Sequence, residues 1–552
     1  MTVEPSRRVV IVGGGIGGMS AAITAADEGL ETILVEKAPR FGGAAAYSGG
    51  QVWVGANHVE ERQSLEDSLE ATLQYVCGAA ARDAASVDLE LARQWLAGAA
   101  EAARYLEDQG VVEWEVIPDY PDYYYPDVDG SRATGRYLTG APFDGSLLGE
   151  HRSLLPVSPH FPVGVTYGEM FSWGGMSSRT KFDWGLVERR RADDVLTFGT
   201  GIAGALLKGV LDRTVRLMPG HEVVALLARD GEVVGVRCRR SDGAEIELDG
   251  PVILATGAHD WSAELSSRFT GIPPEDGGSV APDSISGDAV GLVEAVGGAV
   301  AALPAWAAPV LPGYRLPVPS FEGDTGYRAC YEHCLPHTFL VNRGGERFCD
   351  DSFHSRIVAA ALSLDGAGQP ANLPIFMIWD SRHHQRYGLG ATMPGDPYPE
   401  GLVVEASTLA DIAAGLGVDP DGLERTAARF NEHAATGEDP DHGRGSNLSV
   451  RRFRGDWTNQ PNPCLGAVSE PPYFGMRIRL LSTGIAAAGV KAGASGRVQH
   501  EDGSTIPGLY AIGECSTRAA AGVGYNSGYS LSRALAFGRL AALDVARGPQ
   551  AA

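Results

Sequence analysis

The sequence predicts an α/β fold with more than one structural unit, one of them built from both ends of the chain. A chain of 552 residues is too long for one hydrophobic core. Residues 8–36 show the pattern strand, glycine turn, helix, strand, and short apolar strand patterns recur at 251–257 and 508–513. From about residue 297 the composition becomes rich in proline and aromatic residues, which indicates an inserted unit.

Local patterns predict the elements between these landmarks. A helical stretch is expected at about 64–108, and a tyrosine- and proline-rich loop follows at 120–126. Turn signals at 230–231 and 242–243 predict a β-meander over 222–248. These elements all belong to the first part of the unit that begins at the N-terminus.

The limits of the two units follow from where the composition changes. A helix is expected at about 287–299, the chain returns to the first unit near Pro471, and a final helix begins at about 530. The predicted limits are 1–296 and 466–552 for the two parts of the first unit, and 297–465 for the inserted α+β unit.

Composition excludes several classes of protein. The net charge of −24, from 45 basic and 69 acidic residues, would repel nucleic acid. No run approaches the roughly 18 apolar residues that span a membrane, so integral membrane association is not expected. The seven cysteines are scattered without a zinc pattern, so we expect no metal site. The first strand starts near Arg8, which leaves no room for a signal peptide, and we expect a cytoplasmic protein.

The glycine turn carries a dinucleotide-binding fingerprint. The first glycine permits a tight turn, the second lets the backbone approach a pyrophosphate, and the third lets the helix pack on the strand. Glu36 lies 18 positions after Gly18, where a carboxylate can accept hydrogen bonds from a ribose. The candidate residues of this segment are Gly13, Gly15, Gly17, Gly18, Glu36 and Lys37.

Two further segments favour FAD over NAD. A glycine-bracketed loop at 41–50 can lie along a pyrophosphate and an isoalloxazine, and it holds no histidine or cysteine, so the FAD is expected to be non-covalent. Near the other end, Glu514 can hold ribityl hydroxyls, and a helix N-terminus can stabilise negative charge on a reduced flavin. The candidate residues are Gly42, Gly43, Ala44, Ser48, Gly49, Gly50, Val224, Thr256, Gly257, Glu514, Ser530 and Leu531.

Taken together, these segments resemble the fumarate reductase and 3-ketosteroid dehydrogenase flavoprotein superfamily. The likeness rests on the segments 335–338, 342–348, 431–444, 461–463 and 508–514. The stretch at 431–444, together with Pro461-Asn-Pro463, is similar to the ketosteroid dehydrogenase branch. The resemblance implies a Rossmann-type FAD-binding domain from both chain ends, an inserted α+β catalytic (cap) domain, and a substrate held between them.

The segment 525–531 is similar to the Tyr-x-Ser-Gly-x-Ser-Leu segment of the Δ4-(5α) ketosteroid dehydrogenases. The resemblance implies that Tyr525 and Ser527 are active-site residues. In the Δ1 branch the equivalent tyrosine and a backbone amide polarise the ketone of the substrate. Such hydrogen bonds stabilise the enolate-like charge that forms when the α-proton leaves.

The chain departs from this family at the position of the catalytic base. The Δ1 enzymes carry a tyrosine where this chain has Ser355, and the Δ4-(5α) enzymes carry theirs where it has His354. Histidine can act as base or acid, so His354 is a candidate catalytic residue. Fumarate reductases use an arginine near this point, but Arg356 is one position out of register, which disfavours a dicarboxylate substrate.

The loop at 120–126 resembles the loop that brings an aromatic residue over the substrate in the ketosteroid enzymes. Matching on Pro126 selects Tyr124, while Tyr123 and Tyr125 remain alternatives. His433 lies within a segment matched to the family and is expected to be structural.

These residues predict an FAD-dependent dehydrogenase that introduces a double bond beside the ketone of a steroid or similar cyclic substrate, by α-proton abstraction and hydride transfer to flavin N5. One alternative is a reductase of an enone, because the same groups work in both directions. A second alternative is a flavin-binding protein without catalysis, since Ser355 and His354 replace the expected base. The residues do not identify the electron acceptor or donor.

Overall fold

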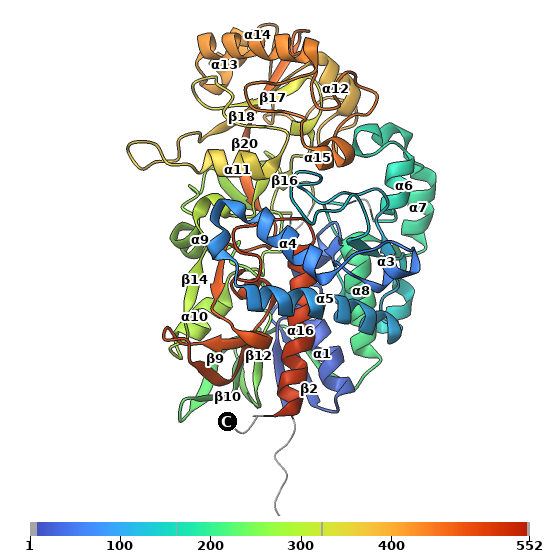
Figure 1. Ribbon diagram of the computed structural model, residues 1–552, viewed down its shortest axis with the longest axis vertical. Helices are drawn as coiled ribbons and strands as arrows, with labels where there is room; N and C mark the ends of the chain where they lie inside the picture. Colours follow the sequence, from blue (N-terminus) through green and yellow to red (C-terminus); the bar gives the residue numbers. More distant parts are fainter. Residues whose placement is uncertain (1–7, 162, 322–323, 549–552) are drawn as a thin grey trace, which may run out of the picture.

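The computed structural model describes residues 8–161, 163–321 and 324–548. Its first sheet has the strand order β22-β23-β12-β1-β2-β8, and all neighbours are parallel except β22 and β23. Figure 1 shows two of these strands, β2 and β12, in the lower part of the molecule. The strands are β1 (Arg8–Val12), β2 (Glu31–Glu36), β8 (Val215–Pro219), β12 (Val252–Leu254), β22 (Arg497–Gln499) and β23 (Thr505–Ala511). Strands from both chain ends are therefore neighbours, which confirms the predicted fold class.

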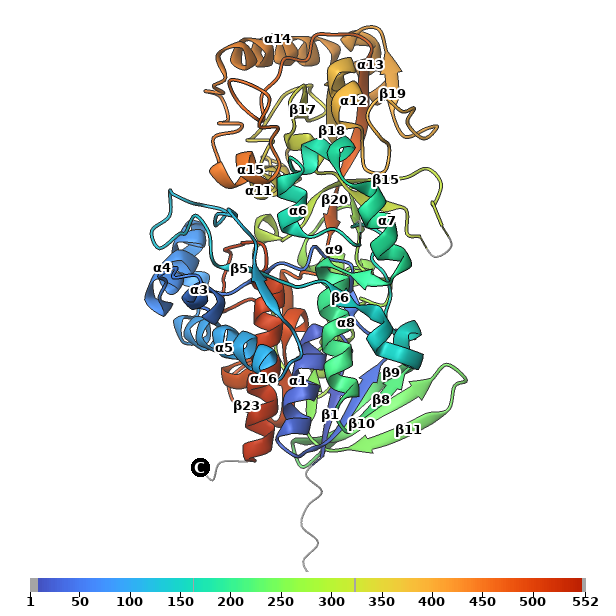
Figure 2. The ribbon, with the colours of Figure 1, turned by 90° about the vertical axis from the view of Figure 1, so that its right-hand side faces the viewer.

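The two ends of the chain also meet through their helices. Helix α1 (Ile16–Asp27) begins within the glycine turn, because Gly15 forms its N-cap. It lies along the final helix α16 (Tyr529–Arg547), as Figure 2 shows. A Cβ on Gly538 would lie 2.5 Å from the carbonyl oxygen of Gly17, so the two backbones approach closely. This packing requires a glycine in α16.

The remaining elements of this unit follow the predicted order. The stretch 64–108 forms α4 (Leu69–Ala79) and α5 (Leu89–Asp108), separated by a 3₁₀ turn. The predicted meander consists of β9 (His221–Arg229), β10 (Glu232–Arg240) and β11 (Glu245–Asp249). Among the other helices of this unit are α8 (Phe198–Leu211) and α10 (Asp288–Glu294). No helix among the described residues has both the length and the apolar character needed to span a membrane.

The second unit has a mixed sheet with β20 (Tyr473–Ser482) near its middle. Its other strands are β13 (Gly277–Ser279), β15 (Leu311–Arg315), β16 (Tyr327–Ala329), β17 (Thr338–Val341), β18 (Ile375–Asp380) and β19 (Val404–Ala406). The helices of this unit are α11 (His354–Ala361), α12 (Ser381–Tyr387), α13 (Leu409–Leu416), α14 (Pro420–Thr436) and α15 (Leu448–Phe453). The sheet extends past the predicted limits of 297 and 465, because β13 pairs with β20.

Two buried histidines of the second unit predict a loss of stability in acid. Burial lowers the pKa of His333 and of His383 to about 3, from an ordinary value of 6.5. Below pH 6.5 the unfolded chain binds protons that the folded chain does not, so the free energy of unfolding falls as the pH drops from 6.5 toward 3. Each histidine should remove about 2 kcal/mol between pH 7 and about pH 5.

Urea unfolding at these two pH values measures the effect. The variant His383→Gln should show a shallower pH dependence than the wild type, because one of the two proton-binding sites is gone from its unfolded state. If the free energy of unfolding falls with pH equally in both proteins, His383 does not contribute to the loss of stability in acid.

Candidate active site

A cavity of about 1160 Å³ is lined by residues of both units. This volume exceeds the roughly 300–1,000 Å³ of most small-molecule pockets. The glycine turn after β1 lines one part of it, and an aromatic group that includes Tyr123 and Tyr525 lines another. The cavity can therefore hold a dinucleotide together with a second, smaller molecule.

The three fingerprint glycines have different roles. Gly13 has a φ of +108°, and a Cβ on Gly18 would lie 1.9 Å from the Gly13 carbonyl oxygen, so these two positions are fixed by packing. Gly15 lines the cavity, and a Cβ there would meet no atom of the described residues within 4 Å. It precedes the first turn of α1, which has no side-chain cap and includes the cavity-lining Gly17. Uncapped amides of this kind bind phosphate.

Glu36 lies at the end of β2 and lines the cavity. Its carboxylate accepts hydrogen bonds from the backbone nitrogens of Gly14, at 2.7 Å, and Ala38, at 2.8 Å, while burial raises its pKa. Lys37 also lines the cavity, but its Nζ is 2.7 Å from a carboxylate oxygen of Asp288. Glu36 thus has oxygens placed for a ribose, and Lys37 has its charge balanced within the chain.

The glycine-bracketed loop borders the same space and begins with α2 (Gly43–Ala46). The backbone nitrogen of Gly42 donates to the carbonyl oxygen of Gly14 at 2.8 Å, which fastens the loop to the glycine turn. Gly42 and Gly18 do not line the cavity. Gly18 has the packing role expected of the third glycine, and a cofactor contact of Gly42 stays a prediction. The predicted residues that do line it are Gly43, Ala44, Ser48, Gly49 and Gly50.

The far end of the chain completes this part of the cavity. Glu514 lies 3.0 Å from the guanidinium of Arg533 and accepts a hydrogen bond from the backbone nitrogen of Ala486 at 3.1 Å. Ser530 and Leu531 lie in the first turn of α16, whose N-cap Gly528 makes no side-chain capping bond. The predicted residues here that line the cavity are Thr256, Gly257, Glu514, Ser530 and Leu531. The uncapped helix end suits negative charge.

The prediction for Val224 is corrected by the structure, because Val223 lines the cavity and Val224 does not. Successive side chains of a strand point to opposite faces, so an error of one position in β9 exchanges the two. The other features fit FAD: two helix N-termini without side-chain caps, a buried carboxylate after β2, and a loop of small residues beside the first turn of α1.

The variant Gly15→Val should weaken FAD binding at least tenfold without unfolding the protein. The valine side chain would begin in a space free of protein atoms, but it would project into the cavity at the first turn of α1, where FAD is expected to bind. Titration of the apoprotein with FAD measures the affinity. Gly168→Val is the matched control, because a Cβ on Gly168 also meets no described atom within 4 Å and Gly168 lies outside the cavity. Equal losses in the two variants would contradict this role.

Three aromatic side chains meet at the other end of the cavity. The ring centroids of Tyr525 and His354 are 5.8 Å apart. The ring centroid of Tyr123 lies 6.1 Å from that of Tyr525 and 5.6 Å from that of His354. His354 is the first residue of α11, whereas Tyr525 precedes α16. The fold therefore brings together two predicted catalytic residues that are 171 positions apart in the chain.

The Tyr525 hydroxyl is set up as a hydrogen-bond donor. Burial raises the pKa of Tyr525, and the guanidinium of Arg518, 5.5 Å from its ring centroid, opposes only part of that effect. The phenol is thus protonated at neutral pH. Ser527 also lines the cavity, and its hydroxyl donates to the side-chain oxygen of Gln51, which lines the cavity as well. Ser527 therefore has a partner within the chain.

His354 is a neutral imidazole at the cavity wall. Burial is the main cause that lowers its pKa well below 6.5, and the charge of Arg454 and the neighbouring His333 lower it further. A neutral imidazole can accept a proton. Ser355 does not line the cavity, and Arg356 lines a separate, smaller pocket. Of the residues considered for the base, His354 is the one that faces the cavity.

The selection of Tyr124 is corrected in favour of Tyr123. Tyr123 lines the main cavity, whereas Tyr124 lines the smaller pocket beside Arg356. Ser527 and Tyr120, which act on the pKa of Tyr123, also line the main cavity. Matching on Pro126 identified the correct loop, but it selected a tyrosine one position away from the one that lines the main cavity.

Arg454 is a cavity residue that the sequence reading did not identify. It follows α15, in a run with Arg451 and Arg452 that has the pattern of an exposed basic helix end. Its guanidinium lies 4.8 Å from the ring centroid of Tyr331, another unpredicted cavity residue. The spacing of the three arginines does not predict that Arg454 lines the cavity while Arg451 and Arg452 do not.

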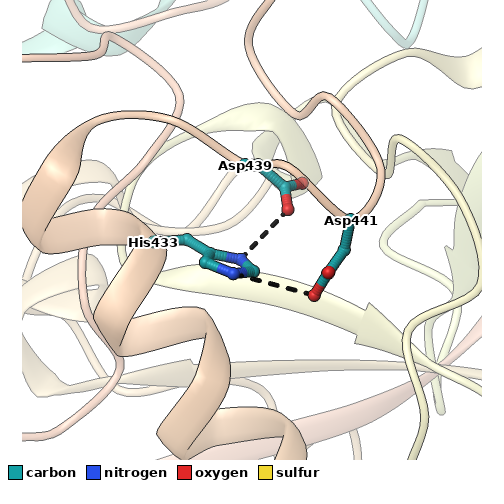
Figure 3. A group of neighbouring side chains, drawn as sticks. All are labelled: His433, Asp439 and Asp441. Carbon is teal, nitrogen blue, oxygen red and sulfur yellow. Dashed lines mark ion pairs between the residues drawn. The ribbon is translucent and has the colours of Figure 1, made fainter.

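His433, Asp439 and Asp441 form a group with potential metal ligands (Figure 3). The Nδ1 of His433 is 3.1 Å from Asp439 and its Nε2 is 3.7 Å from Asp441. Both carboxylates are also paired with arginines, Asp439 with Arg347 at 2.7 Å and Asp441 with Arg429. These charges are balanced within the chain, and the contacts tie the end of α14 to the loop that follows it.

Comparison with known proteins agrees with this geometry. Residues 8–531 match the sequence family described as FAD binding domain. The crystal structure of 3-ketosteroid delta1-dehydrogenase from Sterolibacterium denitrificans in complex with 1,4-androstadiene-3,17-dione superposes with a TM-score of 0.87, at 26% identity, over 98% of this chain and 99% of that chain.

Two curated relatives align over nearly the whole chain. The 3-oxosteroid 1-dehydrogenase of Mycobacterium tuberculosis is 30% identical over 568 residues, which cover 98% of each protein. The 4-oxocyclohex-2-ene-1-carboxylate 5-dehydrogenase of Sinomonas cyclohexanicum is 30% identical over 572 residues, covering 98% of this chain and 93% of that protein.

Proposed function

We propose, since this chain belongs to the FAD binding domain family, that it is an FAD-dependent dehydrogenase that introduces a carbon–carbon double bond beside the ketone of a cyclic substrate. One observation carries the proposal: a phenol and a neutral imidazole, with ring centroids 5.8 Å apart, line the cavity that elsewhere fits FAD. The two curated relatives support it, since the names of both describe dehydrogenases of oxo-substituted ring compounds.

Each side chain has a separate task in this proposal. The hydroxyl of Tyr525 donates a hydrogen bond to the ketone oxygen and stabilises the negative charge that develops there. His354 accepts the proton from the α-carbon, which its neutral form allows. Tyr123 packs against both rings and holds them in place.

The reaction removes one proton and one hydride from neighbouring carbons. FAD, when bound, supplies the acceptor for the hydride that leaves the β-carbon. The two electrons of the broken C–H bond at the α-carbon form the new double bond, so the substrate is oxidised by two electrons. The aromatic lining around Tyr525 excludes water from the enolate-like charge.

An anaerobic screen of steroids and smaller cyclic ketones tests this function. Bleaching of the flavin absorbance by a saturated ketone is the expected result. Reoxidation of the reduced flavin by an enone, with no bleaching by any saturated ketone, would establish the reductase instead. A purified protein that neither contains nor binds FAD would overturn both.

A further inference from the structure

The guanidinium of Arg454 is a half-buried cation at the cavity wall, without an anionic partner among the described residues. Among the described residues it has no ion pair and no side-chain hydrogen bond, and its close neighbours are the rings of Tyr331 and Phe453, with centroids at 4.8 and 5.8 Å. Two other arginines of the chain, by contrast, do have anionic partners. Arg136 and Arg444, both 1% exposed, each pair with a buried aspartate at 2.9 Å or closer.

The groups around Arg454 do not balance its charge. The groups whose charges act on it most strongly are Cys334, Tyr123, Tyr331 and Tyr120, and all of these are neutral near pH 7. The nearby Glu332 is already engaged, because it accepts hydrogen bonds from the backbone nitrogen of Gly390 at 2.8 Å and of Tyr331 at 3.0 Å, and pairs with Arg179 at 3.7 Å.

A half-buried guanidinium that lines the cavity and has no anionic partner in the described residues is placed to bind an anion that enters the cavity. The planar guanidinium matches a carboxylate with two parallel hydrogen bonds. Its charge also lowers the pKa of both His354 and Tyr525, which means that it lies near the two groups assigned to the ketone. The anion and the ketone are thus expected on the same small molecule.

We propose that Arg454 binds the carboxylate of an anionic ring ketone and so selects an oxo-acid over a neutral steroid. This inference rests on the proposed function, which supplies the ketone position at Tyr525. A neutral ring ketone would leave the guanidinium without a partner in the cavity. A ring that carries both a ketone and a carboxylate can bind Tyr525 and Arg454 at the same time.

Calorimetric titration of the FAD-loaded protein tests the proposal, with 4-oxocyclohexanecarboxylate and its methyl ester as probes. The two probes share the ring and the ketone but differ in charge. We expect the acid to bind at least 30-fold more tightly than the ester to the wild type, and the variant Arg454→Met to lose this preference while binding the ester as before. Arg454→Lys should keep part of it.

Arg452→Met is the matched control. Arg452 lies two positions earlier, in α15 and outside the cavity, and pairs with Asp119 at 2.7 Å. This variant should retain the full preference for the acid. The flavin spectrum and the melting temperature show whether Arg454→Met is folded, and the wild-type comparison of acid and ester decides the question even if it is not.

The outcomes separate this inference from the proposed function. Tight, Arg454-dependent binding of the acid without bleaching by any ketone would retain the carboxylate site and reject the dehydrogenase. Bleaching by cyclic ketones with equal affinity for acid and ester would retain the dehydrogenase and reject the carboxylate site. Equal losses for acid and ester in Arg454→Met would assign Arg454 to the ketone and also overturn the proposal.

Discussion

The variant Tyr525→Phe should reduce bound FAD with a ring ketone about 10²–10³ times more slowly than the wild type, the loss typical of removing one oxyanion donor. The change deletes one hydroxyl and keeps the ring that packs against Tyr123 and His354. Substrate affinity should change much less, because the hydrogen bond strengthens as charge develops on the ketone oxygen. Stopped-flow absorbance under anaerobic conditions measures the rate at saturating ketone.

Tyr529→Phe provides the control for this experiment. Tyr529 lies four positions later, is buried, and its hydroxyl has no hydrogen-bond partner among the described residues. It does not line the cavity, so its loss should leave the rate within a few-fold of the wild type. An unchanged rate in Tyr525→Phe would remove Tyr525 from the mechanism.

Replacement of His354 by glutamine should slow the same step by about 10²–10⁴, the usual contribution of a positioned general base. Glutamine retains a polar side chain of similar length but cannot take up the α-proton. Because the pKa of His354 lies well below 6.5, the wild-type rate should not fall through protonation of this residue between pH 8 and about pH 6.

The neighbouring variant Ser355→Ala distinguishes the two positions considered for the base. Ser355 does not line the cavity, so its change should leave the rate of flavin reduction near the wild-type value. A large loss of the flavin-reduction rate in Ser355→Ala, with a normal rate in His354→Gln, would assign the base to position 355, where the Δ1 enzymes carry their tyrosine.

The cofactor-binding part of the fold was predictable because its requirements are local. The positive φ of Gly13 and the close approach of Gly18 to the Gly13 carbonyl both arise within the turn, and Glu36 follows from the length of one helix and one strand. The spacing of these residues in the sequence is therefore enough to predict the cofactor-binding turn. The pairing of β20 with β13 could not be read in this way, since partners about 200 residues apart leave no local pattern.

Two further choices at the site could not be made from the sequence, for a related reason. The choice between Tyr123 and Tyr124 depends on the rotation of an irregular loop, for which a sequence has no fixed period. The inward direction of Arg454 depends on what α15 packs against, while its own neighbours Arg451 and Arg452 have the composition of a surface. In both cases tertiary packing decides between chemically similar neighbours.

The close packing of α1 on α16 has a consequence for synthesis in the cell. The first turn of α1 is made at the start of translation, but the helix that completes its surroundings begins at Tyr529. At roughly 5–20 residues per second, tens of seconds separate the two on the ribosome. During that interval the apolar face of α1 has no final partner, so we expect FAD to bind only after α16 has been synthesised.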